Sequence, residues 1–423
     1  MTEHLAPDAL LLELLSPQAP MAASAIAELG SDAWQRILGA VRQHRLAPLL
    51  HWNLAKLQPD LRVPDDVRHE LAASFRQATA RALLLQRELV QIHRILTQAA
   101  IPYQALKGAF LAFHAYPHPA LRPLRDLDIL VPRSQAIQAF ETLLAAGMTP
   151  AEGDVWKGDL ATQICLKNHL TPLQSAGGRV QIEVHASLSM PIAVEPGARD
   201  LGDDPGYWER GITRQVAGET LCFPAPTDLL LHLITHATLH HRLDNGPLIL
   251  SDIAYLIRLG TVDWISFWQR AKSCGGSRAS WLMLRLAERY WGSLEIIWPA
   301  SPEPLDGQEQ AEVAALALML RDPSTSRELN IINTLTRQGT ATARVGELWQ
   351  RLFPSRSRMI AEYPVRPGSS YLYVYVLYAR RLWRLLSRRM PEFLGARRSE
   401  RFDHDLEQLT VLDRWLGKTC NTP

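Results

Sequence analysis

Two aspartates lie two residues apart in an apolar run, and this pattern restricts the fold of the chain more than any other. The run reads Asp126-Leu-Asp128-Ile-Leu-Val131. Side chains alternate between the two faces of a strand, so both carboxylates lie on one face while Leu127 and Ile129 lie on the other. Two like charges held side by side repel each other unless a positive charge lies between them. The pattern therefore predicts a strand that binds a divalent cation, Mg²⁺ or Mn²⁺, through Asp126 and Asp128.

Phosphate-binding residue types precede this strand. Lys107 is a compact point charge suited to a phosphate, and Gly108 lets the backbone approach a ligand closely. Arg122 and Arg125 flank the approach to the strand, where a guanidinium can bind phosphate oxygens in a bidentate manner. The alternative for each arginine is a surface ion pair with the acidic cluster. A glycine turn, a helix and an Asp-x-Asp strand are together typical of metal-dependent nucleotidyl transfer.

The same residues resemble the uncharacterised nucleotidyltransferase family of the DNA polymerase β nucleotidyltransferase superfamily. Leu106-Lys107-Gly108, Arg122 before the Asp-x-Asp motif, and the order of predicted elements carry the resemblance. It implies an α+β fold, in which a polymerase β-type core (a small mixed sheet with flanking helices) is embedded in N- and C-terminal helical regions. It also implies a nucleoside triphosphate substrate and favours Arg122 over Arg125. Gly108-Ala109 departs from the Gly-Gly or Gly-Ser of the superfamily but matches this family.

A third carboxylate is predicted on a hairpin downstream. The first arm covers residues 165–174, and the second arm, 179–185, alternates apolar and polar side chains, so Glu183 and His185 share a face. The resemblance implies that Glu183 completes the metal site or accepts the proton of the attacking hydroxyl group. The alternative is a solvated carboxylate on an exposed sheet face. His185 and His169 lie on opposing arms, and for each we favour a structural hydrogen bond over catalysis.

A helix that begins at Pro226 carries histidines four residues apart on one face, namely His232, His236 and His240. Asp252 follows on the next predicted helix. His236, His240 and Asp252 suit a metal or phosphate site, although the spacing lacks the glutamate of a zinc protease motif. The other interpretation is a polar seam between two domains. The resemblance includes this pattern and implies that these residues contribute to the floor of the site.

Length and periodicity predict three regions. At 423 residues the chain is long enough for two or three domains. We predict an N-terminal helical region over 1–99, a nucleotidyltransferase core over 100–224, and a C-terminal helical domain over 225–423. The longest predicted helix extends from about residue 65 to residue 99. The apolar share of 47% and the charged share of 21% are ordinary for a soluble globular protein.

Charge and cysteine usage bear on partners and on the compartment. The net charge is only +2, but residues 344–401 are rich in arginine and contain no lysine. A solvated helix face paired with nearby acids is the commoner outcome for such a stretch, and the alternative is a site for RNA, another polyanion or membrane phosphates. The four cysteines are far apart and form no Cys-x-x-Cys pair, the N-terminus lacks a signal peptide, and no transmembrane segment is predicted. We therefore expect a cytoplasmic protein.

These observations predict a metal-dependent enzyme. It would move a nucleoside monophosphate from a nucleoside triphosphate to a hydroxyl-bearing acceptor (a small molecule, a peptide or an RNA end) and release pyrophosphate. One alternative is a glycosyl- or phosphoryl-transferring variant that uses the same carboxylates and metal. Another is a helical binding module with a vestigial site, but clustered carboxylates without a cation are unfavourable.

Overall fold

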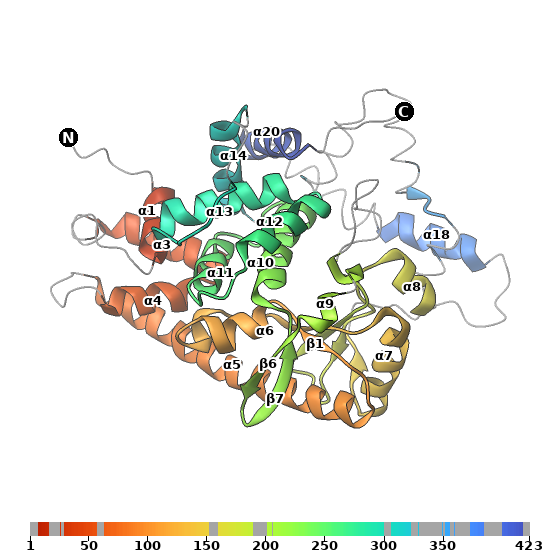
Figure 1. Ribbon diagram of the computed structural model, residues 1–423. Helices are drawn as coiled ribbons and strands as arrows, with labels where there is room; N and C mark the ends of the chain where they lie inside the picture. The colour runs from red at the N-terminus through yellow and green to blue at the C-terminus, as the bar shows by residue number, and fades with distance from the viewer. Residues whose placement is uncertain are drawn as a thin grey trace.

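The chain folds into a small mixed sheet surrounded by helices, as the computed structural model in Figure 1 shows. The structure describes residues 7–16, 26, 29–56, 63–151, 160–188, 201–204, 206–299, 306–322, 329, 349, 352–355, 359, 373–384 and 400–417. The predicted fold class, an α+β core embedded in helical regions, is confirmed.

The N-terminal region is helical, as the apolar periodicity predicts. Its helices are α1 (Pro7–Leu15), α3 (Ser31–His44), α4 (Ala47–Lys56) and α5 (Asp65–Gln98). The long helix α5 buries one stripe spaced three and four residues apart, made of Leu85, Leu89, Ile92 and Leu96. It packs against α4 at its N-terminal end and reaches the sheet at its other end (Figure 1). One helix thus connects the N-terminal region to the core.

The main sheet has five strands in the order β1-β2-β5-β4-β3. They are β1 (Gln104–Ala105), β2 (Asp126–Leu130), β3 (Thr149–Pro150), β4 (Leu173–Gln174) and β5 (Gln181–His185). β2 and β5 are parallel, and the other neighbours are antiparallel. Helix α7 (Ala136–Ala145) lies between β2 and β3 in the chain and packs against both α5 and β5.

Burial fixes which face of the sheet carries charge. Leu127 and Ile129 of β2 are buried, as are Ile182 and Val184 of β5. The alternate residues of both strands therefore lie on the opposite face. The register pairs Asp128 with Glu183, which places two of the predicted carboxylates side by side on neighbouring strands.

Two parts of the predicted sheet were wrong or incomplete. The first arm of the predicted hairpin begins within a helix, α8 (Leu160–Leu166), and the strand is confined to β4. The Gln163 side chain accepts a hydrogen bond from the Thr171 backbone N–H at 2.8 Å, which folds the chain back on this helix.

The prediction was also incomplete because it contained no strand at β6 (Ile212–Val216), which pairs with β7 (Glu219–Phe223) in a second, two-stranded sheet. Their turn has positive φ at Ala217 (49°) and Gly218 (87°), as a type I′ hairpin turn requires. Alanine is unusual at this position, so the turn carries no clear sequence signal.

The C-terminal region is helical over its described parts. Its helices are α10 (Pro226–Thr235), α11 (Leu248–Ile257), α12 (Trp264–Ser273), α13 (Ser277–Trp291), α14 (Gln308–Leu320), α18 (Tyr373–Arg384) and α20 (Glu400–Trp415). The short helix α9 (Gly206–Glu209) precedes β6 and lies within the predicted core. Buried apolar side chains from all three predicted regions form one continuous core. The domain boundaries after residues 99 and 224 stay a prediction.

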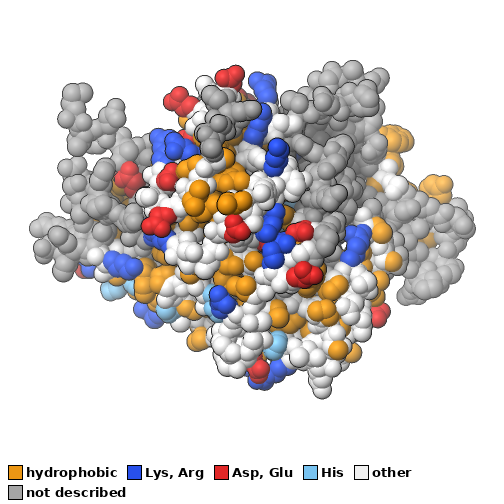
Figure 2. Space-filling view, viewed as in Figure 1, with side chains coloured by type: hydrophobic (Ala, Val, Ile, Leu, Met, Phe, Trp, Pro, Cys, Tyr) orange, Lys and Arg blue, Asp and Glu red, His pale blue; other side chains and the backbone are white. Residues whose placement is uncertain are grey.

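Charges of both signs are dispersed over the visible surface. On the face in Figure 2, Lys and Arg side chains lie among Asp and Glu side chains. Much of the arginine-rich stretch 344–401 lies outside the described residues, including the predicted polyanion ligands Arg388, Arg389, Arg397 and Arg398. Across the part of the chain that is described, no helix has both the length and the apolar character needed to cross a bilayer.

A buried carboxylate joins α10 to two neighbouring segments, and its removal tests this part of the fold. The Asp228 side chain is 0% exposed and accepts hydrogen bonds from Arg210 Nε at 2.9 Å and Arg270 Nη1 at 2.6 Å. Asp228→Ala should lower the free energy of unfolding in urea by about 2–3 kcal/mol, because both arginines lose a charged acceptor but reach water. Asp204 also binds Arg210 but is 38% exposed. Asp204→Ala should therefore cost less than about 1 kcal/mol, and equal losses would contradict this assignment.

Candidate active site

The backbone is strained where β1 leads into the site. Lys107 has a φ of 45°, which is uncommon for a residue other than glycine, and it precedes the short helix α6 (Gly108–Phe110). The preceding residue, Leu106, donates its backbone N–H to the Asp128 carbonyl at 2.9 Å. The Lys107 ammonium thereby lies 3.3 Å from Asp128 Oδ1. Strained backbone of this kind persists where the surrounding structure holds it, often at functional sites.

Gly108 is closely surrounded by side chains of the protein, and the predicted approach of its backbone to a ligand stays a prediction. A Cβ added to Gly108 would lie 2.3 Å from Leu124 Cδ2 and 3.3 Å from Arg122 Nη1. Any side chain at this position would therefore displace Leu124 and crowd the guanidinium of Arg122. Glycine is needed here for the space between the turn and the arginine.

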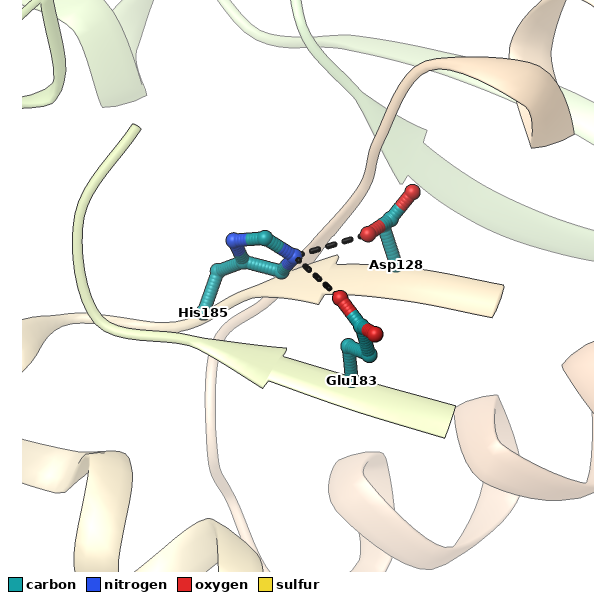
Figure 3. Close-up of side chains that lie close together, drawn as sticks. All are labelled: Asp128, Glu183 and His185. Carbon is teal, nitrogen blue, oxygen red and sulfur yellow. Dashed lines mark hydrogen bonds and ion pairs between the residues drawn. The ribbon is translucent and has the colours of Figure 1, made fainter. Parts of the chain in front are cut away.

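Asp128, Glu183 and His185 converge at the centre of the site (Figure 3). His185 Nε2 lies 2.7 Å from Asp128 Oδ1 and 3.6 Å from Glu183 Oε2. Gln181 Nε2 donates a hydrogen bond to Glu183 Oε1 at 3.2 Å. His169 Nε2 lies 4.0 Å from Glu183 Oε2. As the hairpin predicts, His169 faces His185, and their ring centroids are 5.4 Å apart.

The two aspartates of the motif differ in their electrostatic surroundings. Burial, together with the charges of Asp128 and Glu183, raises the pKa of Asp126 to about 6. Burial also disfavours the charged form of Asp128, but Lys107 and the hydrogen bond from His185 bring its pKa well below the ordinary value. Asp126 lies on the same strand face as Asp128, but it is not one of the three residues whose ligand atoms converge.

A proton on His185 would reduce the repulsion between the carboxylates of Asp128 and Glu183. Burial and Lys107 both lower the pKa of His185, but hydrogen bonds to Asp128 and Glu183 outweigh them and raise it. Burial raises the pKa of Glu183, and the hydrogen bond from His185 outweighs this effect and lowers it. When His185 is protonated, its imidazolium places a positive charge between two carboxylates.

These three residues fit a divalent cation. Asp128, Glu183 and His185 each offer one ligand atom, and all three atoms lie within 4.8 Å of one another. Carboxylate oxygens suit Mg²⁺ and Mn²⁺, whereas an imidazole nitrogen suits transition metals and must be deprotonated to bind. The cluster can therefore exchange the proton of His185 for a metal ion.

Arg122 is held by a helix that is distant in the sequence. Its Nε and Nη2 donate to the carboxylate of Asp252 on α11, with a shortest distance of 2.9 Å. Tyr116 donates its hydroxyl to Asp252 Oδ1 at 2.8 Å. Asp252 is therefore an anchor for Arg122 and does not join His236 and His240 in a metal cluster among the described residues. The backbone carbonyl of Arg125 accepts a hydrogen bond from Arg81 Nη2 at 3.1 Å.

The histidine helix departs from α-helical spacing. After α10, residues His236–His240 form a turn of π-helix, so His241 donates its backbone N–H to the His236 carbonyl at 3.0 Å. The ring centroids of His236 and His241 lie 4.3 Å apart in a tilted arrangement, closer than the 5.8 Å between those of His236 and His240. Such π-turns are frequent at functional sites. His236 thus contacts the ring of His241 as well as that of His240, and the contribution of His236 and His240 to the site stays a prediction.

Two residues near the site carried no signal in the sequence. The pKa of His241 falls to about 4, chiefly through burial and then through Lys107, with Asp128 and Glu183 acting in the opposite sense. Burial and Arg125 lower the pKa of Arg45, while Asp126 raises it. His241 and Arg45 therefore lie within electrostatic range of the carboxylates. Arg45 follows α3 and has a left-handed backbone conformation (φ 60°). The N-terminal region thus contributes a residue near the site.

A buried histidine beneath the site predicts a specific loss of stability in acid. Burial and Lys107 lower the pKa of His232 far below its ordinary value, so the folded protein keeps it neutral. The unfolded chain binds a proton there below about pH 6.5. The free energy of unfolding should therefore fall with decreasing pH, by about 1.4 kcal/mol per pH unit for this group. Urea unfolding from pH 7 to pH 5 should show a shallower pH dependence for His232→Gln, but not for His69→Gln on the exposed surface of α5.

The comparisons with known proteins agree with this geometry. Residues 30–292 match a family model described as an uncharacterised nucleotidyltransferase. The matched span includes the strained Lys107 turn, both strands of the carboxylate cluster and Asp252. No curated protein and no solved structure gives a significant match. The family match covers more than half of the chain, which therefore belongs to this uncharacterised nucleotidyltransferase family.

Proposed function

We propose that the protein transfers a nucleoside monophosphate from a nucleoside triphosphate to a hydroxyl group and releases pyrophosphate. The observation that carries this proposal is the cluster of Asp128, Glu183 and His185 beside the Lys107 ammonium. A cluster of carboxylates suits a divalent cation, and an adjacent lysine suits the phosphates that accompany such a cation. Both are required when a triphosphate is bound and cleaved.

Asp128 and Glu183 would hold Mg²⁺ or Mn²⁺, with Asp126 on the same strand face as a further ligand. The bound metal would neutralise charge on the phosphates and on the leaving pyrophosphate. Before a cation binds, His185 would hold Asp128 in place through the 2.7 Å hydrogen bond between His185 Nε2 and Asp128 Oδ1. Asp126 is the carboxylate with the raised pKa, and an added cation would bring its pKa down again.

The cationic side chains would bind the phosphates. The Lys107 ammonium lies 3.3 Å from Asp128 of the carboxylate cluster. The guanidinium of Arg122 lies beside Gly108, which has no side chain to crowd it. Asp252 engages Nε and Nη2 of Arg122, whereas Nη1 has only a 3.3 Å contact with the Pro123 carbonyl. Nη1 is therefore the nitrogen of Arg122 best placed to meet a phosphate oxygen. Arg45 and Arg125 would add positive charge at the edge of the site, within range of Asp126.

The proposed reaction is an in-line displacement. The acceptor oxygen attacks the α-phosphorus, the bond from that phosphorus to the bridging oxygen of the β-phosphate breaks, and pyrophosphate leaves with the electron pair. The proton of the hydroxyl group passes to a carboxylate of the site, for which Glu183 is placed beside Asp128. Positioning and charge neutralisation would supply most of the rate enhancement, as in other phosphoryl transfers.

Metal-dependent nucleotide binding is the direct test. Unfolding temperatures would be measured with each nucleoside triphosphate, with Mg²⁺ or Mn²⁺ and without either. Binding should stabilise the wild-type protein by about 2.7 kcal/mol at a hundredfold excess over the dissociation constant. Asp128→Asn should lose the metal-dependent part, while Asp66→Asn on the exposed start of α5 should retain it. A rise in unfolding temperature that needs no metal would favour another donor chemistry. No rise with any nucleotide would favour a binding module with a vestigial site.

The anchor of Arg122 gives a second, independent test. Asp252→Asn keeps the shape of the side chain but removes the charge that orients the guanidinium, so nucleotide affinity should fall about tenfold, or about 1.4 kcal/mol. Tyr116→Phe removes only the 2.8 Å hydrogen bond to Asp252 and keeps its ion pair with Arg122. Nucleotide titrations should therefore show a clearly smaller loss for Tyr116→Phe. Equal losses would mean that the pair does not orient Arg122 for nucleotide.

A further inference from the structure

His241, the residue after the π-turn, lies near the carboxylate cluster and can be reached from solvent. Its side chain is exposed, whereas that of His232 is only 3% exposed. The protein around His241 nevertheless desolvates it and lowers its pKa to about 4, and the charges of Lys107, Asp128 and Glu183 also act on this pKa. A side chain that is both accessible and partly desolvated lies in a recess. His241 is therefore placed where a ligand of the cluster can touch it.

The backbone that follows His241 is strained. Arg242 and Leu243 have φ angles of 46° and 65°, in the left-handed region that residues other than glycine, asparagine and aspartate seldom adopt. Leu243 is 0% exposed and donates its backbone N–H to the Ala237 carbonyl at 2.7 Å. Two strained residues in succession persist only where the surrounding structure holds them. The conformation of this loop, residues 241–246, therefore depends on its contacts.

Helices from the end of the chain supply two of these contacts. Arg242 Nε lies 3.6 Å from Asp413 Oδ2 on α20, and the Asp413 side chain is 2% exposed. Asp244 forms an ion pair with Arg321, which directly follows α14. Helices α14 and α20 pack against each other (Figure 1). The loop is thus held by a unit that lies beyond residue 292, where the family match ends.

We propose that His241 contacts the phosphates of the bound nucleotide and that the ion pair between Arg242 and Asp413 positions it there. A neutral imidazole can donate its N–H to a phosphate oxygen, and it adds no positive charge that would repel Lys107. Asp413 is then a positioning residue, which acts on the nucleotide through His241. This inference rests on the proposed function, because it assigns a further residue to the same nucleotide site.

Chemical modification tests the contact in the wild-type protein. Diethyl pyrocarbonate acylates accessible imidazoles, so both His241 and His69, which is exposed on α5, should react in the free protein. Mg²⁺ together with each ribonucleoside triphosphate in turn would then be added before the reagent. A nucleotide that binds should protect His241 and should leave His69 reactive. Peptide mass spectrometry reads both histidines in one sample.

Nucleotide titrations test the positioning role. His241→Ala should weaken Mg²⁺-dependent nucleotide binding about tenfold, because a hydrogen bond to a charged phosphate is lost. Asp413→Asn keeps the shape of the side chain but removes the charge that holds Arg242, so it should weaken binding about threefold. In the His241→Ala background, Asp413→Asn should cause no further loss, since Asp413 acts only through His241.

A matched control separates positioning from a general loss of stability. Glu312 on α14 is 9% exposed and forms an ion pair with Arg289 at 3.3 Å. Glu312→Gln therefore also removes a buried charge from the C-terminal unit, but it does not touch the loop. Nucleotide affinity should stay unchanged in this variant.

The outcomes distinguish this inference from the proposed function. No nucleotide binding by the wild-type protein would refute the proposed function, and this inference with it. Binding without protection of His241, or unchanged affinity in a folded His241→Ala variant, would overturn only the inference. An undiminished effect of Asp413→Asn in the His241→Ala background would show that Asp413 does not act through His241 and would overturn the positioning role.

Discussion

The parallel pairing of β2 with β5 determines where the charges of the site lie. Its register sets Asp128 beside Glu183 and brings His185 within hydrogen-bond distance of Asp128. A shift of one residue in either strand would turn its carboxylates into the core and expose its apolar side chains. The burial of Leu127 and Ile182 opposes such a shift. The hydrophobic core therefore fixes the geometry of a polar site on the opposite face of the sheet.

The same pairing brings the carboxylates of Asp128 and Glu183 close together, and the neighbouring groups of Lys107 and His185 reduce their repulsion. Lys107 and the hydrogen bond with His185 lower the pKa of Asp128, whereas burial and the neighbouring carboxylates raise the pKa of Asp126 to about 6. Metal binding would replace the protons of these groups, so metal affinity and proton release are linked at this site. Asp128, Glu183 and His185 thus form a group whose ligand atoms suit a divalent cation.

The sequence was sufficient to predict the parts of the site that lie within one strand or one turn. Side-chain direction in a strand depends only on position. Alternation therefore predicted that Asp126 and Asp128 share one face of β2, and that Glu183 and His185 share one face of the second hairpin arm. Asp252 was predicted as part of a histidine cluster, but it pairs with Arg122. A sequence contains no direct signal for a contact between residues 130 positions apart. The roles of the individual site residues stay predictions.

The histidine helix shows a different limit of the sequence. A spacing of four residues predicts one face only if the helix stays regular, and the π-turn at His236 brings the ring of His241 closer to His236 than that of His240. A second π-helix follows Gly108, over Leu111–Ala115, so both segments that border the site depart from regular helix. Local rules of structure fail here, where functional sites commonly break them.

The helical regions are part of the site because the sheet alone cannot complete it. Three of its five strands have only two residues each, too few to bury a core without helices packed on them. The ion pair between Arg122 and Asp252 crosses the boundary predicted after residue 224, and Arg45 approaches from before residue 100. Both contributions come from helices that share one core with the sheet. A phosphate site assembled in this way depends on the packing of all three regions, so the stability of the helices and the geometry of the site are linked.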